Sequence, residues 1–284
     1  MILAMHRSGT ADNIRLGVWL DDLRLGIKAG LRAIEPLRVE AVGLEAFGPE
    51  LAPRNLSQTG RRDLARVVRS KGANLSALKA DVGGRRLADA KTLDASLLRL
   101  REAAQLASDV GAEHLVVAAG LLPLPQPPQR DTGQEDDAAA RAALTEAARA
   151  LCEIASRSRA RICWSGGNEA PESLAGFLSS VDPEGILQLD LNPGAYMLRG
   201  IAPLVALREL APRVALATAA DFYRGGGEAP LGQGDVRWGE LFIALSALPR
   251  PAHILAACGL EGDRVALLAA SYNRLKALRR NPMG

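Results

Sequence analysis

The sequence predicts an α/β protein folded as a (β/α)8 TIM barrel, and three observations lead to this fold class. The chain has 284 residues, close to the roughly 250 residues that one such barrel takes. Short apolar runs alternate with longer segments of helical periodicity along the whole chain. The runs begin about every 35 residues, which is the spacing of a βα unit. We therefore expect residues 1–284 to form one barrel domain.

Eight apolar runs are the expected strands. Several consist almost entirely of apolar or small residues, as strands buried on both faces of a parallel sheet do. In chain order they are Arg15–Leu20, Val39–Ala46, Asn74–Ala80, His114–Gly120, Ala160–Gly166, Ile186–Leu191, Val214–Phe222 and Ala252–Gly259.

The segments between these runs place apolar residues three and four positions apart, which is typical of amphipathic helices. Leu97, Leu100 and Ala104 follow this spacing in one such segment. Pro171 stands where a helix begins, and Gly111 stands where another ends before a strand. A doubly wound open sheet is the rival architecture, but no glycine-rich fingerprint follows the first expected strand.

Two segments lie outside the repeating pattern. Residues 1–13 form an N-terminal extension without the continuous apolar core of a signal peptide. Residues 121–137, after the fourth strand, hold four prolines and then several polar residues, so we expect a long loop. In a barrel this loop would lie on the C-terminal face, where function is placed. Two interpretations stay open for it, a surface excursion and a cover over the pocket.

The composition limits the function classes. The chain has 35 Lys and Arg residues against 32 Asp and Glu residues, and a formal net charge of +3. This balance predicts helix faces of mixed charge and no nucleic-acid surface. We expect no membrane span, because no stretch of about 18 apolar residues occurs. Cys152, Cys163 and Cys258 are far apart and odd in number, so we expect reduced thiols in a cytoplasmic protein.

Four segments resemble a known family, in the same order along the chain. They are the region before the second helix at residues 53–64, the helix at residues 97–112, Leu187-Gln-Leu-Asp-Leu-Asn192, and Leu231-Gly-Gln-Gly-Asp-Val-Arg-Trp238. Together they resemble the xylose isomerase-like TIM barrels, a group that includes sugar and sugar-phosphate isomerases, epimerases and apurinic endonucleases. The resemblance covers nearly the whole chain, and its most specific part is the Gly-x-Gly-Asp segment at Gly232–Asp235.

The resemblance implies a divalent metal at the barrel mouth, the opening at the C-terminal ends of the strands. Its usual ligands are carboxylates and histidines at the ends of the fifth to eighth strands. In this chain most of those positions carry other residues, namely Ser165, Pro193, Thr218 and Ala257, while Asp190 and Asp221 are retained. We therefore expect either no metal or a hard ion held by oxygen ligands, Mg²⁺ or Mn²⁺ rather than Zn²⁺.

The three histidines support this expectation. His6 precedes the barrel, and His114 and His253 stand at the starts of expected strands. Strand starts lie at the N-terminal face, roughly 15–20 Å from the mouth at about 3.3 Å per residue. We therefore expect no histidine at the mouth. An apurinic endonuclease with its trinuclear zinc site is correspondingly not expected.

The candidate site residues are polar side chains near strand ends. Glu45, Asp190 and Asp221 are the catalytic candidates, and Asp190 and Asp221 are also the candidate metal ligands. The candidates for substrate binding are Lys79, Asn168, Asn192, Arg224 and Trp164. Each also has a purely structural interpretation: a turn cap for Asp190, a salt bridge for Asp221, solvated charges for Glu45 and Lys79, and packing for Trp164. Arg224 precedes three glycines that could cradle a phosphate or simply form a flexible loop.

Two functional hypotheses follow. The first is a sugar phosphate isomerase or epimerase-like enzyme that acts on a small sugar or polyol at the barrel mouth. The second is a catalytically degenerate barrel, or pseudoenzyme, that serves as a ligand-binding or interaction scaffold, because fold alone does not fix function. The oligomeric state stays open, with a homodimer through loops or the C-terminal helix at Asp263–Arg280 as one arrangement.

Overall fold

Eight parallel strands close into a barrel in the computed structural model, which describes residues 13–83, 87–118, 134–167, 169–250 and 252–283. The barrel strands are β1 (Ile14–Trp19), β2 (Ala41–Glu45), β3 (Asn74–Asp81), β4 (His114–Ala118), β5 (Arg161–Ser165), β6 (Gln188–Leu191), β7 (Val214–Ala219) and β10 (Ala252–Ala256). They are hydrogen-bonded in sequence order, and β10 closes onto β1 with Ile14 beside Ala252. The predicted barrel is therefore confirmed.

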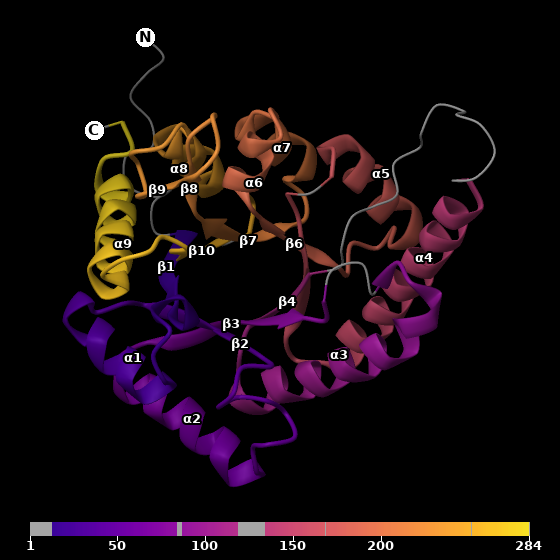
Figure 1. Cartoon of the computed structure of the whole chain (residues 1–284), viewed down its shortest axis with the longest axis horizontal. Coiled ribbons are helices and arrows are strands. Elements are labelled where there is room, and N and C mark those ends of the chain that lie inside the picture. Colours follow the sequence, from indigo (N-terminus) through magenta and orange to yellow (C-terminus); the bar gives the residue numbers. More distant parts are fainter. Residues whose placement is uncertain (1–12, 84–86, 119–133, 168, 251, 284) are drawn as a thin grey trace.

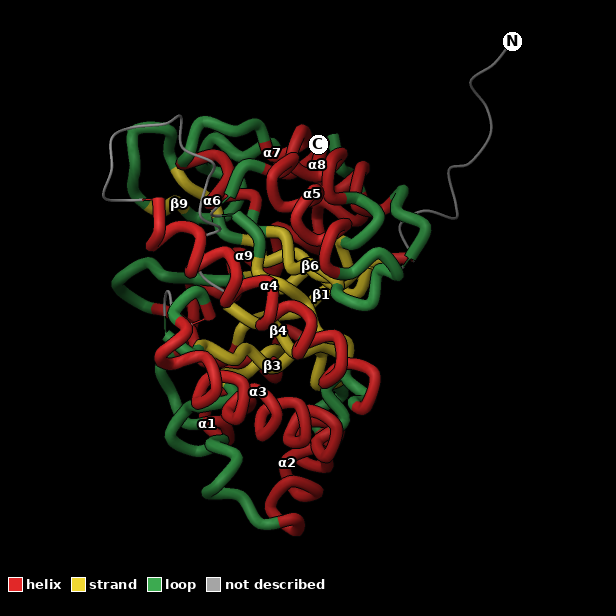
Figure 2. The backbone as a smooth tube through the Cα atoms, turned by 90° about the vertical axis from the view of Figure 1, so that its right-hand side faces the viewer, coloured by secondary structure: helices red, strands yellow, loops and turns green. Residues whose placement is uncertain are grey.

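Helices surround the strands on all sides (Figure 1). They are α1 (Ile27–Ile34), α2 (Gln58–Ser70), α3 (Ala90–Val110), α4 (Gln134–Arg157), α5 (Pro171–Val181), α6 (Pro193–Leu198), α7 (Pro203–Leu210), α8 (Trp238–Ser246) and α9 (Arg264–Arg280). Two short 3-10 helices, η2 (Leu20–Leu23) and η3 (Glu35–Leu37), flank α1. Figure 2 shows α3 and α4 lying outside the strands.

The structure corrects two predicted boundaries. The run predicted as one strand at Val214–Phe222 divides, because β7 ends at Ala219 and Asp221–Phe222 forms β8, which pairs antiparallel with β9 (Glu228–Ala229). The loop predicted over residues 121–137 ends earlier, because α4 begins at Gln134. Residues 121–133, like the extension at residues 1–12, lie outside the described residues.

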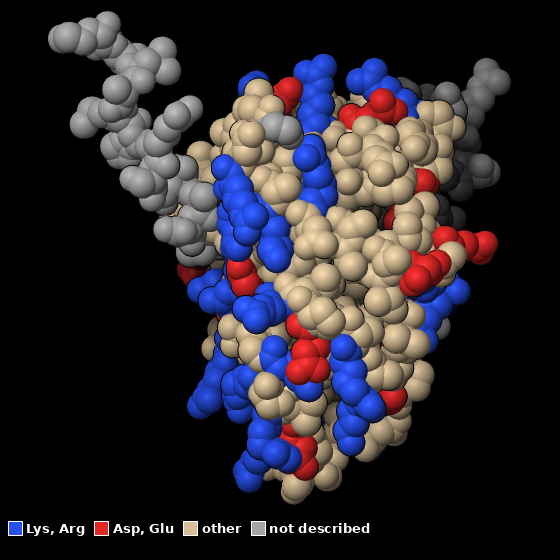
Figure 3. All heavy atoms as spheres, turned by 90° about the vertical axis from the view of Figure 1, so that its left-hand side faces the viewer, with Lys and Arg blue, Asp and Glu red and all other residues tan. Residues whose placement is uncertain are grey.

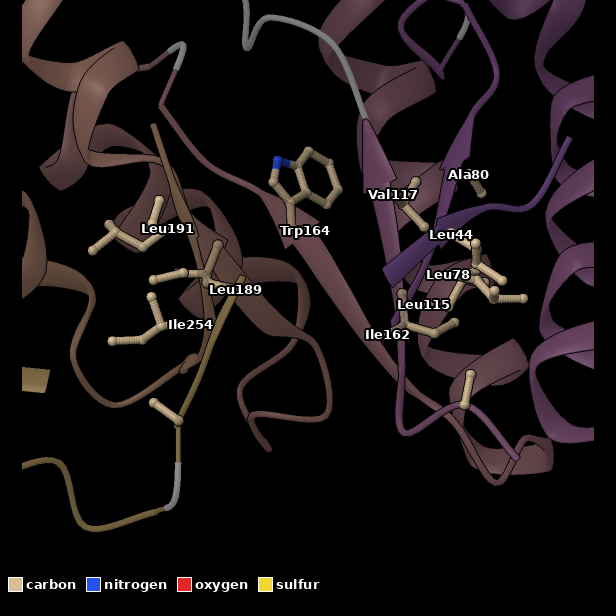
Figure 4. Close-up of a cluster of buried hydrophobic side chains, with 14 of the residues drawn as sticks. Leu44, Leu78, Ala80, Leu115, Val117, Ile162, Trp164, Leu189, Leu191 and Ile254 are labelled. Carbon is tan, nitrogen blue, oxygen red and sulfur yellow. The ribbon is translucent and has the colours of Figure 1, made fainter. Parts of the chain in front are cut away.

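Side chains on the two faces of each strand enter different apolar clusters. Outward side chains pack against the helices; among them are Leu44, Leu78, Leu115, Ile162, Trp164, Leu189 and Ile254 (Figure 4). A second cluster contains only strand residues from around the barrel: Trp19, Ala41, Ala77, Val116, Cys163, Ala215, Leu216 and Leu255. This second set fills the barrel interior, as the alternation of side chains along closed strands requires.

The interior becomes polar at the N-terminal end of the barrel. His114 and His253 are buried there with ring centroids 4.8 Å apart. The imidazole Nδ1 of His253 is hydrogen-bonded to the Ser76 hydroxyl at 2.5 Å, and Nδ1 of His114 donates to the Ser76 carbonyl at 3.2 Å. Both histidines therefore lie at strand starts, away from the mouth, as predicted. His6 lies outside the described residues.

The outer surface carries mixed charge. On the side of the molecule in Figure 3, Lys and Arg side chains are interspersed with Asp and Glu side chains. Lys71 pairs with Glu35 at 2.9 Å and Arg279 with Glu40 at 2.6 Å. In the part of the chain that the structure describes, no helix has the length and apolar character needed to cross a bilayer.

Candidate functional site

The mouth of the barrel joins side chains from strands that are far apart in the sequence. Strand register places Glu45 of β2 beside Lys79 of β3, and Ser165 of β5 beside Asp190 of β6. The sequence gives only the positions of these residues along the chain. The pairing of parallel strands shows which of them are neighbours at the barrel mouth. This end of the barrel is where TIM barrels bind their ligands.

Glu45 and Lys79 form an ion pair that a ligand can reach. Lys79 Nζ lies 3.5 Å from Glu45 Oε1, and 44% and 36% of the two side chains is exposed. Burial raises the pKa of Glu45 above its ordinary value, and Lys79 opposes the shift. Glu45 is thus a carboxylate of increased basicity at the mouth, which suits proton transfer at neutral pH.

Two further carboxylates at the mouth were not among the predicted residues. Asp21 and Asp22 follow β1 in the short helix η2. An Asp21 carboxylate oxygen accepts the backbone N–H of Glu45 at 2.6 Å, and one of Asp22 accepts that of Cys258 at 2.7 Å. Burial raises the pKa of Asp22 to about 6. The acidic pair directly after the first strand is the sequence signal that could have identified them.

A chain of hydrogen bonds crosses the interior below the mouth. The indole Nε1 of Trp19 donates to Thr218 Oγ1 at 3.2 Å, and this hydroxyl lies 3.0 and 3.1 Å from the two oxygens of Asp190. Because an indole nitrogen can only donate, the hydroxyl of Thr218 accepts from Trp19, and it donates its hydrogen to Asp190 when that carboxyl is ionised. For the ionised state the order of donation is therefore Trp19, Thr218, Asp190.

Asp190 is a deeply buried acid at the mouth, with 4% of its surface exposed. Burial raises its pKa to about 7, and the hydrogen bond from Thr218 opposes this shift. Both protonation states are consequently accessible near neutral pH. The predicted turn-cap alternative does not apply, since Asn192, and not Asp190, caps α6 by accepting the N–H of Ala195 at 3.1 Å.

Asp221 has different surroundings from Asp190. Its two oxygens accept backbone N–H groups from Phe222, Gly232, Gly234 and Val236, at 2.8–3.2 Å. These bonds hold the segment after β7 in place, and 1% of Asp221 is exposed. In the described part of the chain Asp221 is bonded to these backbone N–H groups and forms no salt bridge, so the structural interpretation as an ion pair is wrong. The geometry gives Asp221 an organising role in the loop, and its catalytic or metal-binding role stays a prediction.

The glycine run after Arg224 has a local structural explanation. Gly226 and Gly227 have φ values of 94° and 89° and form the turn of the β8–β9 hairpin. Arg224 lines a separate cavity of about 540 Å³ between α6, α7 and α8, together with Arg237, Asp235 and Glu240. The N–H groups of Tyr223 and Gly226 bond within the turn, so they do not face a phosphate.

The prediction that Trp164 binds substrate by stacking is wrong. Only 1% of this residue is exposed, and its ring lies 5.7 Å from that of Phe177 in α5. A ring without free surface cannot stack on a ligand, so Trp164 packs between the barrel and the helices. Asn168 lies outside the described residues. Asn192 uses its carbonyl oxygen to cap α6, and its amide group stays a predicted sugar contact.

The donor set does not fit the divalent metal that the resemblance implies. Ser165, Thr218 and Ala257 stand at strand ends in place of ligands, and the Thr218 hydroxyl is already bonded to Asp190. Among the residues that the structure describes, no group of three or more His, Cys, Asp or Glu side chains is arranged to hold a metal ion. Within the described part of the chain, the Lys79 ammonium is a cation at the mouth that pairs with one of the carboxylates there, Glu45.

Comparisons with known proteins agree with this fold. The model of the xylose isomerase-like TIM barrel family matches residues 24–262. A xylose isomerase domain protein from Planctomyces limnophilus is 19% identical, with a TM-score of 0.76 over 94% of this chain and 96% of that one.

Two further solved structures are similar over nearly their whole length. A probable 3-DHS dehydratase from Bacillus anthracis has 14% identity and a TM-score of 0.72, over 92% of this chain and 98% of that one. D-psicose 3-epimerase from Clostridium cellulolyticum H10, solved with D-tagatose, has 12% identity and a TM-score of 0.72, over 94% and 98%. No curated protein matches significantly. At these identities the likeness concerns the fold.

Proposed function

Because this chain belongs to the xylose isomerase-like TIM barrel family, we propose that it binds a small sugar or polyol at the barrel mouth and acts as an isomerase or epimerase. The observation that carries the proposal is the accessible pair of Glu45 and Lys79, whose side chains meet at 3.5 Å. A base and a fixed positive charge side by side are the two groups that proton transfer next to a carbonyl requires.

Each residue has a defined part in this chemistry. Glu45 removes the proton from the carbon beside the sugar carbonyl, and Lys79 donates to the oxygen on which negative charge develops. Asp190, whose pKa is raised to about 7, returns a proton or holds a hydroxyl group. Trp19 and Thr218 position Asp190 through their hydrogen bonds. Asp221 keeps the loop after β7 in place for this site.

The charges at the mouth favour an unphosphorylated sugar over a sugar phosphate. Among the residues that the structure describes, Lys79 is the cation whose charge acts on all four carboxylates there, those of Asp21, Asp22, Glu45 and Asp190. A phosphate dianion would meet like charges at short range, which is unfavourable. Arg224, the predicted phosphate ligand, lines the separate cavity beside α7. We therefore restrict the proposed substrate class to neutral ketoses, aldoses and polyols.

The second candidate function is a binding scaffold without catalysis. The observation that favours it is the replacement of ligand positions by Ser165, Pro193, Thr218 and Ala257. A barrel that retains a sugar pocket but cannot move a proton would bind a ligand at the same mouth.

Solvent isotope exchange separates the two functions. The protein is incubated with D-tagatose, D-fructose or D-psicose in D2O, and deuterium at the carbons next to the carbonyl is followed by NMR. Deuterium exchange by the wild type, together with an exchange rate that falls roughly 100-fold or more in Glu45→Gln, supports the enzymatic function. Glu209→Gln, on the exposed face of α7, is the matched control. Sugar binding without exchange for any of these sugars supports the scaffold.

A further inference from the structure

Lys79 is the positive charge shared by the acidic groups of the mouth. Its ammonium lies 3.5 Å from Glu45 Oε1 and 5.9 Å from the centre of the Trp19 ring. Its charge also acts on Asp21, Asp22 and Asp190, favouring the ionised form of each carboxylate. The carboxylates come from η2 after β1 and from β2 and β6, and Lys79 comes from β3, so its charge links strand ends on both sides of the mouth.

In the barrel interior, the space beside β7 and β10 is filled by the side chain of Trp19. The Trp19 indole extends from β1 to Thr218 on β7, passing the β10 strand that lies between them. It packs with Leu255 and Ala257 in the interior cluster, where Ala257 replaces an expected carboxylate. Gly43 on β2 makes room for the ring, because a Cβ there would overlap Trp19. The Thr218 hydroxyl is hydrogen-bonded to Asp190, so part of the acceptor capacity of this carboxylate is already taken by protein.

We propose that the Lys79 ammonium takes the place of the divalent cation that the family resemblance implies, so that the mouth binds its sugar without a metal ion. This inference rests on the proposed sugar site and names the group that polarises the ligand there. An ammonium carries three donors and a full positive charge on a flexible stem. It can hold a carbonyl or hydroxyl oxygen, and its exposed surface leaves it open to the ligand.

Metal titration tests the inference without any sugar. Free Mn²⁺ is measured by electron paramagnetic resonance against the untagged full-length protein. We expect no saturable binding to the wild type up to about 1 mM, the weak end of protein sites for hard cations. In Lys79→Met the carboxylates lose their cation, and we expect weak, saturable Mn²⁺ binding in the same range. Lys28→Met, at an exposed position of α1, should behave as the wild type. One Mn²⁺ bound per wild-type chain overturns the inference, and so does the absence of binding in Lys79→Met.

Sugar binding gives the second test. The affinity for D-tagatose, measured by calorimetry, should be the same with and without EDTA, and Lys79→Met should weaken it roughly tenfold or more. Lys79→Arg keeps the charge and should recover part of the affinity. A requirement for added Mn²⁺ overturns the inference. If the wild type binds none of the sugars under any condition, the proposed function fails, and the Mn²⁺ titration still decides the role of Lys79.

Discussion

Trp19 and Thr218 are joined across the barrel interior by a hydrogen bond of 3.2 Å, although 199 positions separate them in the chain. The bond fixes the hydroxyl of Thr218, which in turn donates to Asp190. The protonation of a buried acid at the mouth therefore depends on a tryptophan at the end of the first strand.

Thr218→Val should raise the pKa of Asp190 further, because the hydrogen bond that favours the ionised form is removed. The folded pKa of Asp190 is already above that of the unfolded chain, so stability falls as pH rises through the folded value. In the variant this fall continues to higher pH. We expect a loss of about 1–3 kcal/mol that is larger at pH 9 than at pH 6, measured by urea unfolding. Thr59→Val, exposed in α2, is the control. An equal loss at both pH values would contradict the prediction.

The buried histidines should make the fold sensitive to acid. Burial lowers the pKa of both His114 and His253 to about 4. The unfolded chain binds protons near pH 6.5, so each histidine removes stability as pH falls from about 6.5 towards 4, by roughly 2–3 kcal/mol. Asp22 and Asp190 act in the opposite direction over this range, because their folded pKa values are raised. The test is therefore the difference between wild type and His114→Phe in unfolding free energy at pH 7 and pH 4.5. The unfolding free energy of His114→Phe should fall less between pH 7 and pH 4.5 than that of the wild type. If the two proteins lose the same amount, His114 does not contribute to the acid sensitivity.

Gly43→Ala should be destabilising by about 1–3 kcal/mol, because the interior is overpacked where the new methyl group meets the Trp19 ring. Tryptophan fluorescence should change with it, and a second substitution, Trp19→Leu, should recover part of the stability. Gly176→Ala is the matched control in α5, where no atom lies within 4 Å of the added Cβ. This control should stabilise the protein by up to about 1 kcal/mol through helix propensity. Equal effects of the two alanines in thermal unfolding would refute the close packing at Gly43.

Arg213→Met should be strongly destabilising, because it breaks an ion pair that is largely buried. Arg213 lies 2.6 Å from Asp182, of which 1% of the side chain is exposed, and it also donates to the Leu187 carbonyl at 3.0 Å. Its removal leaves the buried carboxylate without its cation and with only the backbone N–H groups of Ile186 and Leu187 as donors, and we expect a loss of unfolding free energy of about 3–5 kcal/mol. Arg66→Met breaks the exposed pair with Asp63 and should change the stability by less than about 1 kcal/mol. Similar losses in chemical unfolding of the two variants would contradict this reading of burial.

Much of the fold could be predicted from the sequence, because parallel strands buried on both faces are nearly continuous apolar runs. The same property conceals which side chains face inward. Trp19 and Trp164 both stand near strand ends, yet Trp19 fills the interior and Trp164 packs against α5. A strand that is apolar on both faces gives no pattern from which to choose between them.

The candidate site was predictable where it depends on strand ends and not where it depends on backbone donors. Glu45 and Lys79 meet because neighbouring parallel strands end at the same edge. Asp190 and Asp221 look equivalent in the sequence, but one accepts a hydroxyl and the other accepts four backbone N–H groups. Those donors belong to a loop conformation that residue types do not specify.

The four hydrogen bonds to Asp221 anchor the base of the β8–β9 hairpin, whereas its tip takes no part in them. The base is tied to the end of the barrel, while added Cβ atoms at Gly225, Gly226 and Gly227 would meet nothing within 4 Å. Exchange of these turn residues for a longer peptide would thus leave the anchor untouched. The hairpin is the part of this rim at which a foreign recognition loop could be grafted while the barrel beneath keeps its shape.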